Sequence, residues 1–292
     1  MANKERLIKY FFTFTGVLST IFLLGIFFLL LYNSVPAFRK IGILEFFTSA
    51  RWNPTSYTKP TYGILSLIVS TLMVTGGAML ISVPLGISCA AYLAEVATPM
   101  VREIVKPIIE VLAGIPSVVV GFLGIVLVGP AIAKIFNLPN GLNAINGSIL
   151  LAIMSLPTII SISEDAITSV PEEYKMASLA LGATRWQTLW KVVIPASSSG
   201  IIAAIMLGVG RAVGETMTVL MATGNAPAMP HSFLDSVRTM TATIAIELGE
   251  VPYNTTHYYA LFVIGLVLFC ITFAVNLTSD IVLHKHQEKL GT

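Results

Sequence analysis

The residues whose types and spacing best suggest chemistry are Arg211 and Glu215, in the run GVGRAVGET. On a helix they would lie one turn apart on one face, where arginine and glutamate can form an ion pair. The run lies inside an apolar stretch. An arginine at the centre of a membrane span costs at least ~2.5–3.5 kcal/mol, so its side chain should face protein or a water-filled path. The pattern favours an anion-interacting pair on a translocation path over a purely structural ion pair.

The glycines of this run, Gly208, Gly210 and Gly214, would let neighbouring helices come close or open a cavity for an anion. The run superficially resembles a dinucleotide-binding glycine loop, but no strand precedes it, which excludes that interpretation. The sequence has no GxxxxGK[ST] phosphate loop and no GxSxG motif, so neither ATP binding by that loop nor hydrolase chemistry is expected. The histidines form no HExxH motif or His/Cys cluster, so no metal site is expected.

The composition is that of a multi-spanning membrane protein. Of the 292 residues, 55% are hydrophobic and only 11% are charged, whereas a soluble domain has roughly 25% charged residues. A net charge of +2 without any basic block argues against nucleic-acid binding. Cys89 and Cys270 lie in apolar runs and are expected to be small buried hydrophobic residues, because their spacing suits neither a disulfide framework nor a metal.

Six stretches are long and apolar enough to cross a hydrocarbon core of ~30 Å, which takes ~20 helical residues. They are Tyr10–Tyr32, Gly63–Leu93, Val105–Ile132, Gly147–Ile167, Gly200–Thr223 and Tyr258–Leu283. The predicted fold is therefore an all-α integral membrane protein with six transmembrane helices. Pro84 should kink the second span, and Pro116 and Pro157 could break helices where a path passes.

An even number of spans places both termini on one side. That side carries ten of the 17 Lys and Arg residues and the other side six, with Arg211 inside a span, so the termini should be cytoplasmic. Two long segments, Asn33–Tyr62 and Gly224–His257, then lie outside and could receive an extracellular partner. The first contains IGILEFF, which we expect to form a helix lying on the membrane surface. The acidic residues near span ends are expected to be interfacial or paired: Glu110, Glu164 and Asp165.

On the side of the termini, Ser169–Pro195 is the one long segment in which polar residues recur among apolar ones. Two helix starts are predicted by capping boxes, Ser169 with Glu172 and Thr184 with Gln187. Pro171 suits a first helical turn and Gly182 a helix end. The apolar positions of the first helix are Tyr174, Ala177 and Leu181; those of the second, which Pro195 should end, are Trp186, Leu189, Trp190, Val193 and Ile194. Two short amphipathic helices at a membrane surface predict a docking site for a partner protein.

Two other functions account for part of this pattern. A stand-alone channel or ion-coupled exchanger could use Arg211 and Glu215 as a gate, but it would not need the amphipathic 169–195 segment. A DNA-binding helix-turn-helix over Glu173–Ile194 is disfavoured, because the aromatic face suits protein docking better. A membrane subunit driven by a separate cytosolic ATPase explains the docking segment, the charged pair and the missing phosphate loop together.

Ser169–Pro195 also resembles the EAA loop of ABC-importer permeases, whose pattern is Glu-Ala-Ala, three residues, Gly, nine residues, and Ile-x-Leu-Pro. This chain has Met176-Ala177-Ser178, Gly182 and VVIP ending at Pro195 at the same spacing, with Met176 in place of the Glu. Beyond the loop, the runs GRAVGETM, LAGIPSVVVG and ATGNAP, and WNP followed by YG, resemble the permeases of phosphate importers. The resemblance covers nearly the whole chain.

The resemblance implies a type I ABC-importer permease (MetI-like) core over residues 63–283, preceded by a first helix and outer loop over 1–62 and followed by a cytoplasmic tail over 284–292. It implies a transmembrane subunit of an ATP-driven inorganic phosphate importer in a bacterial or archaeal plasma membrane, with no cofactor, metal or ATPase site of its own. The implied partners are a second homologous permease, a homodimeric ABC ATPase that binds ATP and Mg, an extracytoplasmic phosphate-binding protein and membrane lipid, without nucleic acid.

The resemblance also assigns roles to individual residues. Those implied on the phosphate path are Arg211 and Glu215, and we expect Thr216 and Thr218 to assist them. Arg211 would offset the charge of phosphate, because its fork of donors suits oxyanions, and the threonine hydroxyls would donate further hydrogen bonds. Those implied in coupling to the ATPase are Glu173, Ala177, Ala180, Gly182, Ala183, Trp186 and Pro195.

Overall fold

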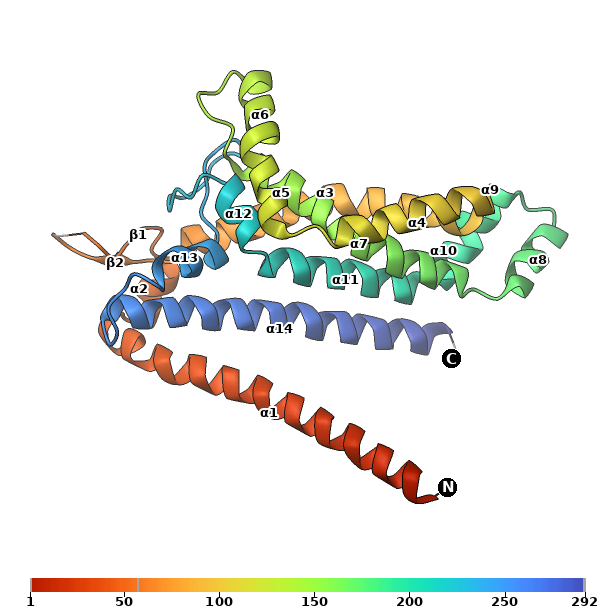
Figure 1. The fold of residues 1–292 in the computed structure, drawn as a ribbon, viewed down its shortest axis with the longest axis horizontal. Coiled ribbons are helices and arrows are strands. Elements are labelled where there is room, and N and C mark those ends of the chain that lie inside the picture. The colour runs from red at the N-terminus through yellow and green to blue at the C-terminus, as the bar shows by residue number, and fades with distance from the viewer. Residues whose placement is uncertain (1, 57, 291–292) are drawn as a thin grey trace.

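The computed structural model describes residues 2–56 and 58–290, which are mostly helical (Figure 1). The longer helices are α1 (Ala2–Ile41), α3 (Leu65–Glu95), α4 (Pro99–Ala113), α7 (Ala144–Thr168), α11 (Ser198–Gly214) and α14 (Thr256–Leu290). The shorter ones are α2 (Ile43–Thr48), α5 (Ser117–Leu123), α6 (Gly129–Phe136), α8 (Glu172–Ala180), α9 (Arg185–Thr188), α10 (Ile194–Ala196), α12 (Met217–Ala222) and α13 (Met240–Glu247), with the π-helical segments η1 (Gly124–Val128) and η2 (Leu189–Val193). Strands β1 (Trp52–Asn53) and β2 (Thr61–Tyr62) pair antiparallel.

Helices α3, α7 and α11 form the centre of a bundle in which each packs against the other two. Helix α14 packs on α11, and α1 lies outermost against α14 (Figure 1). Within the described residues, five helices are long and apolar enough to cross a membrane, or six if the bent pair of Arg185–Ala196 and Ser198–Gly214 is one span. The prediction of six spans is consistent with this arrangement. Both chain ends lie at the end of the bundle that carries α8 and α9, here called the α8 end; α2, β1, β2 and α13 lie at the opposite, α13 end (Figure 1).

The third predicted span, Val105–Ile132, is not one continuous helix. Helix α4 ends at Ala113, and the candidate span begins at Ser117 and runs to Phe136. The chain breaks at Gly114-Ile115-Pro116, because proline has no N–H to donate and disfavours a helical conformation in the residue before it. Beyond the break, α6 projects away from the bundle (Figure 1). Pro116 therefore breaks a helix as predicted, whereas Pro157 lies inside α7.

The fifth predicted span, Gly200–Thr223, is also interrupted. Helix α11 ends at Gly214, and the six-residue α12 starts at Met217. At the other end of α11, the axis bends by 69° between Ala196 and Ser198. The sixth span continues as α14 to Leu290 through most of the predicted tail 284–292, and residues 291–292 lie outside the described part of the chain.

The centre of the bundle is closely packed at Ile159 of α7. A Cβ atom added to Gly86 of α3 would lie 2.6 Å from Cγ2 of Ile159, and one added to Gly208 of α11 would lie 2.9 Å from Cδ1. Both helices therefore approach α7 at a glycine, as the sequence predicts for Gly208. At Gly214, by contrast, a Cβ would meet no atom within 4 Å.

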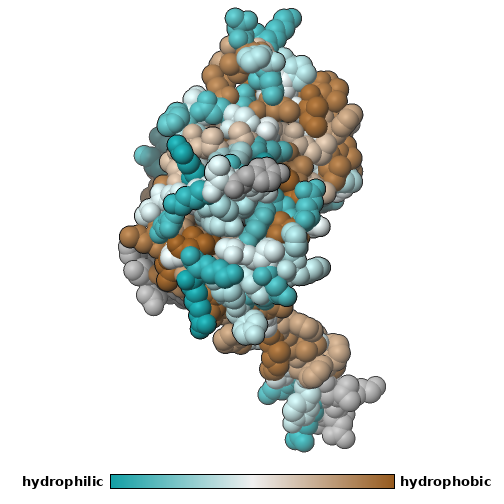
Figure 2. Space-filling model, turned by 90° about the vertical axis from the view of Figure 1, so that its left-hand side faces the viewer, coloured by the Kyte–Doolittle hydropathy of each residue, from teal (hydrophilic) through white to brown (hydrophobic). Residues whose placement is uncertain are grey.

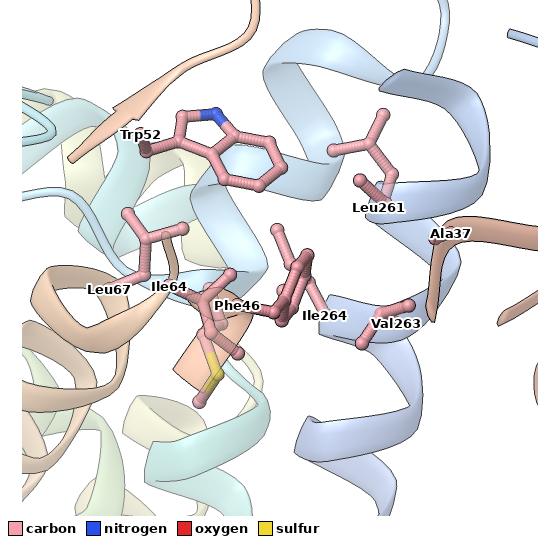
Figure 3. Close-up of a cluster of buried hydrophobic side chains, with 10 residues drawn as sticks. Ala37, Phe46, Trp52, Ile64, Leu67, Leu261, Val263 and Ile264 are labelled. Carbon is pink, nitrogen blue, oxygen red and sulfur yellow. The ribbon is translucent and has the colours of Figure 1, made fainter. Parts of the chain in front are cut away.

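The expectation for the two cysteines needs correction. Cys89 is half-buried and Cys270 is exposed, so neither is the buried residue that was predicted. The run IGILEFF does form a short helix, α2, in which Phe46 is completely buried in protein while Ile43 and Leu44 are exposed. Figure 3 shows Phe46 between Ile64 and Ile264 in an apolar cluster.

The α13 end is held together by a polar cluster around Glu247. Its carboxylate accepts hydrogen bonds from the indole Nε1 of Trp52 at 3.0 and 3.1 Å and from Arg238 at 2.8 Å, and it lies 2.7 Å from Nε2 of His257. The indole ring of Trp52 covers the apolar cluster while its nitrogen points away from it (Figure 3). Hydrophilic residues gather over the centre of the surface at this end, with apolar patches beside them (Figure 2).

Candidate functional site

Arg211 lies in the last turn of α11, and its side chain is exposed. Within the described residues its guanidinium makes no ion pair. The predicted pairing with Glu215 does not occur, because α11 ends between the two residues and Glu215 has an extended backbone (φ −68°, ψ 133°). An unpaired, exposed guanidinium keeps its donors available to an oxyanion.

Glu215 binds the start of the next helix instead. Its Oε1 lies 3.2 Å from the backbone nitrogen of Thr216 and 3.5 Å from that of Thr218. Its own carbonyl accepts a hydrogen bond of 2.9 Å from the hydroxyl of Thr241, in α13. A carboxylate on free N–H groups at a helix start is favourable, because those donors have no partner within the helix. Glu215 thus fixes the break between α11 and α12.

The two threonines of the predicted path have different surroundings. Thr216 is half-buried, and its hydroxyl donates an exposed hydrogen bond of 3.3 Å to the carbonyl of Gly214. Thr218 is completely buried, and its hydroxyl donates to the carbonyl of Ser117 at 3.1 Å and contacts the sulfur of Met154 at 3.0 Å. Thr218 therefore joins α12 to the start of α5 in this conformation, and its hydroxyl does not face an open path.

The 169–195 segment forms the predicted pair of short helices at the α8 end (Figure 1). Gly182 follows α8 with φ +87°, a conformation in which glycine is the favoured residue. Thr184 and Gln187 form the predicted capping box, with bonds of 2.9 and 3.2 Å. The box predicted at Ser169 is wrong: its hydroxyl donates back to the carbonyl of Ala166, and Pro171 precedes α8 as its cap residue.

The second short helix also differs from its prediction. Pro195 does not end it, because the helix widens to a π-helix over Leu189–Val193 and continues through Pro195 to Ala196. A wider turn fits before a proline, which lacks the N–H of a regular helix turn. The apolar side chains of this helix fall into a buried and an exposed group. Leu189 and Val193 are buried, whereas Trp186 and Trp190 are exposed and meet edge to face at 5.6 Å.

Most residues assigned to coupling are on the surface. Glu173, Ala177, Ala180, Gly182, Trp186 and Pro195 are exposed, and Ala183 is half-buried. Leu181 is 90% exposed at the turn, and Trp186 is 65% exposed. Beside them lies a groove of about 570 Å³, lined among others by Met176, Leu179 and Trp186. Apolar side chains displayed around a groove are typical of a site for a partner.

Lys175 anchors α8 to the bundle. Its Nζ lies 2.7 Å from Oε1 of Glu95, at the end of α3, and 3.4 Å from Glu172. Burial alone lowers the pKa of Lys175, but the hydrogen bond and charge attraction to Glu95 outweigh burial and leave that pKa raised. The surface helix therefore follows the end of a central helix.

The family description "Binding-protein-dependent transport system inner membrane component" matches residues 82–287, more than two thirds of the chain. The chain belongs to this permease family. Within it, the chain is 34% identical over 281 residues to the phosphate transport system permease protein PstC of Xylella fastidiosa, covering 90% of this chain and 85% of that protein. It is 41% identical over 233 residues to the probable ABC transporter permease protein YqgH of Bacillus subtilis, covering 80% of this chain and 75% of that protein.

The fold is that of a MetI-like ABC-importer permease. A crystal structure of a bacterial ABC transporter involved in the import of the acidic polysaccharide alginate matches with a TM-score of 0.64 and 16% identity, over 98% of this chain and 99% of that chain. At that identity the similarity shows the fold. Together with its membrane-spanning helices, family membership makes the chain a multi-pass protein of the plasma membrane.

The structure also reveals an ion-pair cluster in this permease whose members the sequence did not connect. Glu164 of α7 is buried and binds Arg102 and Lys106 of α4, and Lys106 also lies 3.5 Å from Asp165. The prediction that Glu164 is paired is confirmed. The spacing of Arg102 and Lys106, one helical turn, signals a shared face, but only the fold shows which acid that face meets.

Proposed function

We propose that this chain is the transmembrane subunit of an ATP-driven importer of inorganic phosphate. The observation that carries the proposal is the exposed guanidinium of Arg211, without an acidic partner among the described residues, in a chain similar to phosphate transport permeases. A fork of charged N–H donors binds tetrahedral oxyanions with good geometry. The position of Arg211 near a helix break, away from the buried bundle centre, suits a path that a second subunit completes.

In this proposal a binding protein delivers phosphate to the α13 end, where hydrophilic residues gather over the centre of the surface (Figure 2). Phosphate then passes between this permease and a second, homologous one. Arg211 offsets its charge, and the hydroxyl of Thr216 can donate to it in exchange for its 3.3 Å bond to Gly214. Glu215 holds the break between α11 and α12 open and places a negative charge nearby, which keeps the site from binding phosphate too tightly to release it.

The energy is supplied by a homodimeric ATPase that binds ATP and Mg and docks on the 169–195 segment. The excess of Lys and Arg on the side of the termini supports a cytoplasmic location for that segment, where ATP is available. Exposed Leu181 and Trp186 supply apolar contact, and the ion pair of Lys175 with Glu95 carries displacement of the segment into α3. Helix α1, whose most apolar stretch is not buried by other parts of the chain, faces lipid.

The proposal is tested by labelled-phosphate uptake into vesicles that contain this chain with its co-purifying partners, with and without ATP on the ATPase side. Uptake that requires ATP and is competed by unlabelled phosphate is expected. Uptake without ATP would contradict the proposal and favour a channel or exchanger. ATP-driven uptake of sulfate in place of phosphate would support an ATP-driven importer but refute phosphate as its substrate.

A further inference from the structure

Glu164 is a buried carboxylate that the phosphate path described above does not use. Its side chain is 1% exposed, whereas Arg102 and Lys106 are 37% and 35% exposed. Arg102 donates to its Oε1, and Nζ of Lys106 lies 2.9 Å from its Oε2. A charge in the interior is costly unless it is paired, so α7 requires these two bases of α4.

Helix α4 depends on the same ion pairs. None of its side chains is buried, although Val105 and Ile109 are half-buried against the core. The helix packs along α7, and the ion pairs join the first turns of α4 to the last turns of α7. A helix with little buried surface is held weakly by packing, so charge attraction across a partly buried contact fixes its position.

The other end of α4 leads to the residues around Arg211. After the break at Gly114-Ile115-Pro116, the carbonyl of Ser117 accepts the hydroxyl of Thr218 at 3.1 Å. The backbone nitrogen of Thr218 lies 3.5 Å from the carboxylate of Glu215. Two hydrogen bonds thus connect the start of α5 with the end of α11.

We infer that Glu164 is a positioning residue for transport, through which α7 carries α4 along when the ATPase subunits close. The inference rests on the proposed function. Movement of the 169–195 segment reaches α3 through the 2.7 Å contact of Lys175 with Glu95, and α3 packs along α7. The Glu164 ion pairs pass the movement to α4. The break at Gly114-Ile115-Pro116 then converts it into a displacement of Ser117, Thr218 and Glu215 beside Arg211.

The test compares Glu164→Gln, Glu164→Asp and the control Glu110→Gln in the complete importer in vesicles. Glutamine keeps the size of the side chain but loses its charge, and aspartate keeps the charge. Glu110 is an exposed acid of the same α4 helix. For each variant we would measure complex assembly, ATP hydrolysis with and without the binding protein, and phosphate taken up per ATP hydrolysed.

We expect Glu164→Gln to assemble normally, to hydrolyse ATP several-fold faster than wild type without the binding protein, and to take up several-fold less phosphate per ATP. Glu164→Asp should recover most of the wild-type ratio, and Glu110→Gln should match wild type. An unchanged ratio in Glu164→Gln would overturn the inference. Loss of assembly in Glu164→Gln would also overturn it, because the ion pairs would then serve folding alone.

The hydrolysis readout separates this inference from the proposed cargo. If wild-type vesicles take up no phosphate, dependence of ATP hydrolysis on the binding protein still reports coupling. Its loss in Glu164→Gln would support the positioning role, and its persistence would refute that role whatever the cargo.

Discussion

Arg211 and Glu215 lie on opposite sides of a helix break, and Glu215 binds the backbone of the next helix instead of the guanidinium. The break has a local cause. Gly214 lacks a side chain that would stabilise a helix end, and the carboxylate of Glu215 satisfies N–H groups at the start of α12. The sequence places the two charges one turn apart, but the structure separates their roles. Arg211 is left available to a ligand, and Glu215 shapes the backbone.

The turn at Gly182 provides a prediction about coupling. Gly182→Val should reduce phosphate uptake per ATP hydrolysed, because a β-branched residue at φ +87° is strained and the turn would change shape. The space around the glycine is open, so the effect comes from backbone conformation and not from a clash. Gly182→Asn is the control. Asparagine tolerates positive φ, as Asn137, Asn225 and Asn254 do in this chain, and should keep the ratio near wild type. Equal ratios in both variants would contradict this account of the turn.

The ion pair of Lys175 with Glu95 predicts a dependence on alkaline pH. The folded-state pKa of Lys175 is raised, so its contribution to stability is complete below the unfolded value of about 10.4 and is lost as pH rises through the folded value. Thermal unfolding of the purified complex should therefore show a larger loss of stability above about pH 10.4 in wild type than in Lys175→Met. The exchanged pair, Lys175→Glu with Glu95→Lys, should restore part of the stability lost in Lys175→Met. A parallel pH profile in wild type and Lys175→Met would rule out this contribution.

The two capping boxes predicted from the sequence, of which only the one at Thr184 forms, allow a matched comparison of variants. Thr184→Ala should destabilise α9 by about 1 kcal/mol, because the cap bonds to Gln187 are present. Ser169→Ala should have a much smaller effect, since its hydroxyl bonds back to Ala166 and caps no helix start. Hydrogen exchange of the amides of the 169–195 segment would measure the difference. Faster exchange in Ser169→Ala than in Thr184→Ala would contradict the assignment.

Much of the fold could be predicted from apolar length alone, because a membrane span is a long apolar helix. The positions of helix breaks were harder to predict from the sequence. Pro116 and Pro157 both lie in apolar runs, yet Pro157 stays inside α7 while the chain breaks at Pro116. A difference is visible locally, since Gly114 lies two residues before Pro116 and no glycine lies as close before Pro157. The packing of α7 on both α3 and α11 also supports its helix through the proline.

Those features of the site that depend on short sequence segments could be predicted. The Thr184 cap, the turn at Gly182 and the charge of Arg211 are properties of short segments. The partners of Glu164 and the hydroxyl contact of Thr218 with Ser117 join segments far apart in the chain, so they depend on how helices pack. Which apolar residues of the second short helix are buried also depends on packing, since Leu189 and Val193 join a core cluster whereas Trp186 and Trp190 are exposed.

The central claim is that Arg211 meets phosphate on its way through the membrane. The most direct measurement is the initial rate of ATP-dependent labelled-phosphate uptake by wild type, Arg211→Ala and Arg211→Lys in the assembled importer. Arg211→Ala should assemble normally and lower the rate about 10- to 100-fold, the loss of a charge-assisted hydrogen bond worth ~1.5–3 kcal/mol. Arg211→Lys should lie in between, since it keeps the charge and loses the fork of donors. An initial uptake rate in Arg211→Ala equal to that of wild type would contradict the account.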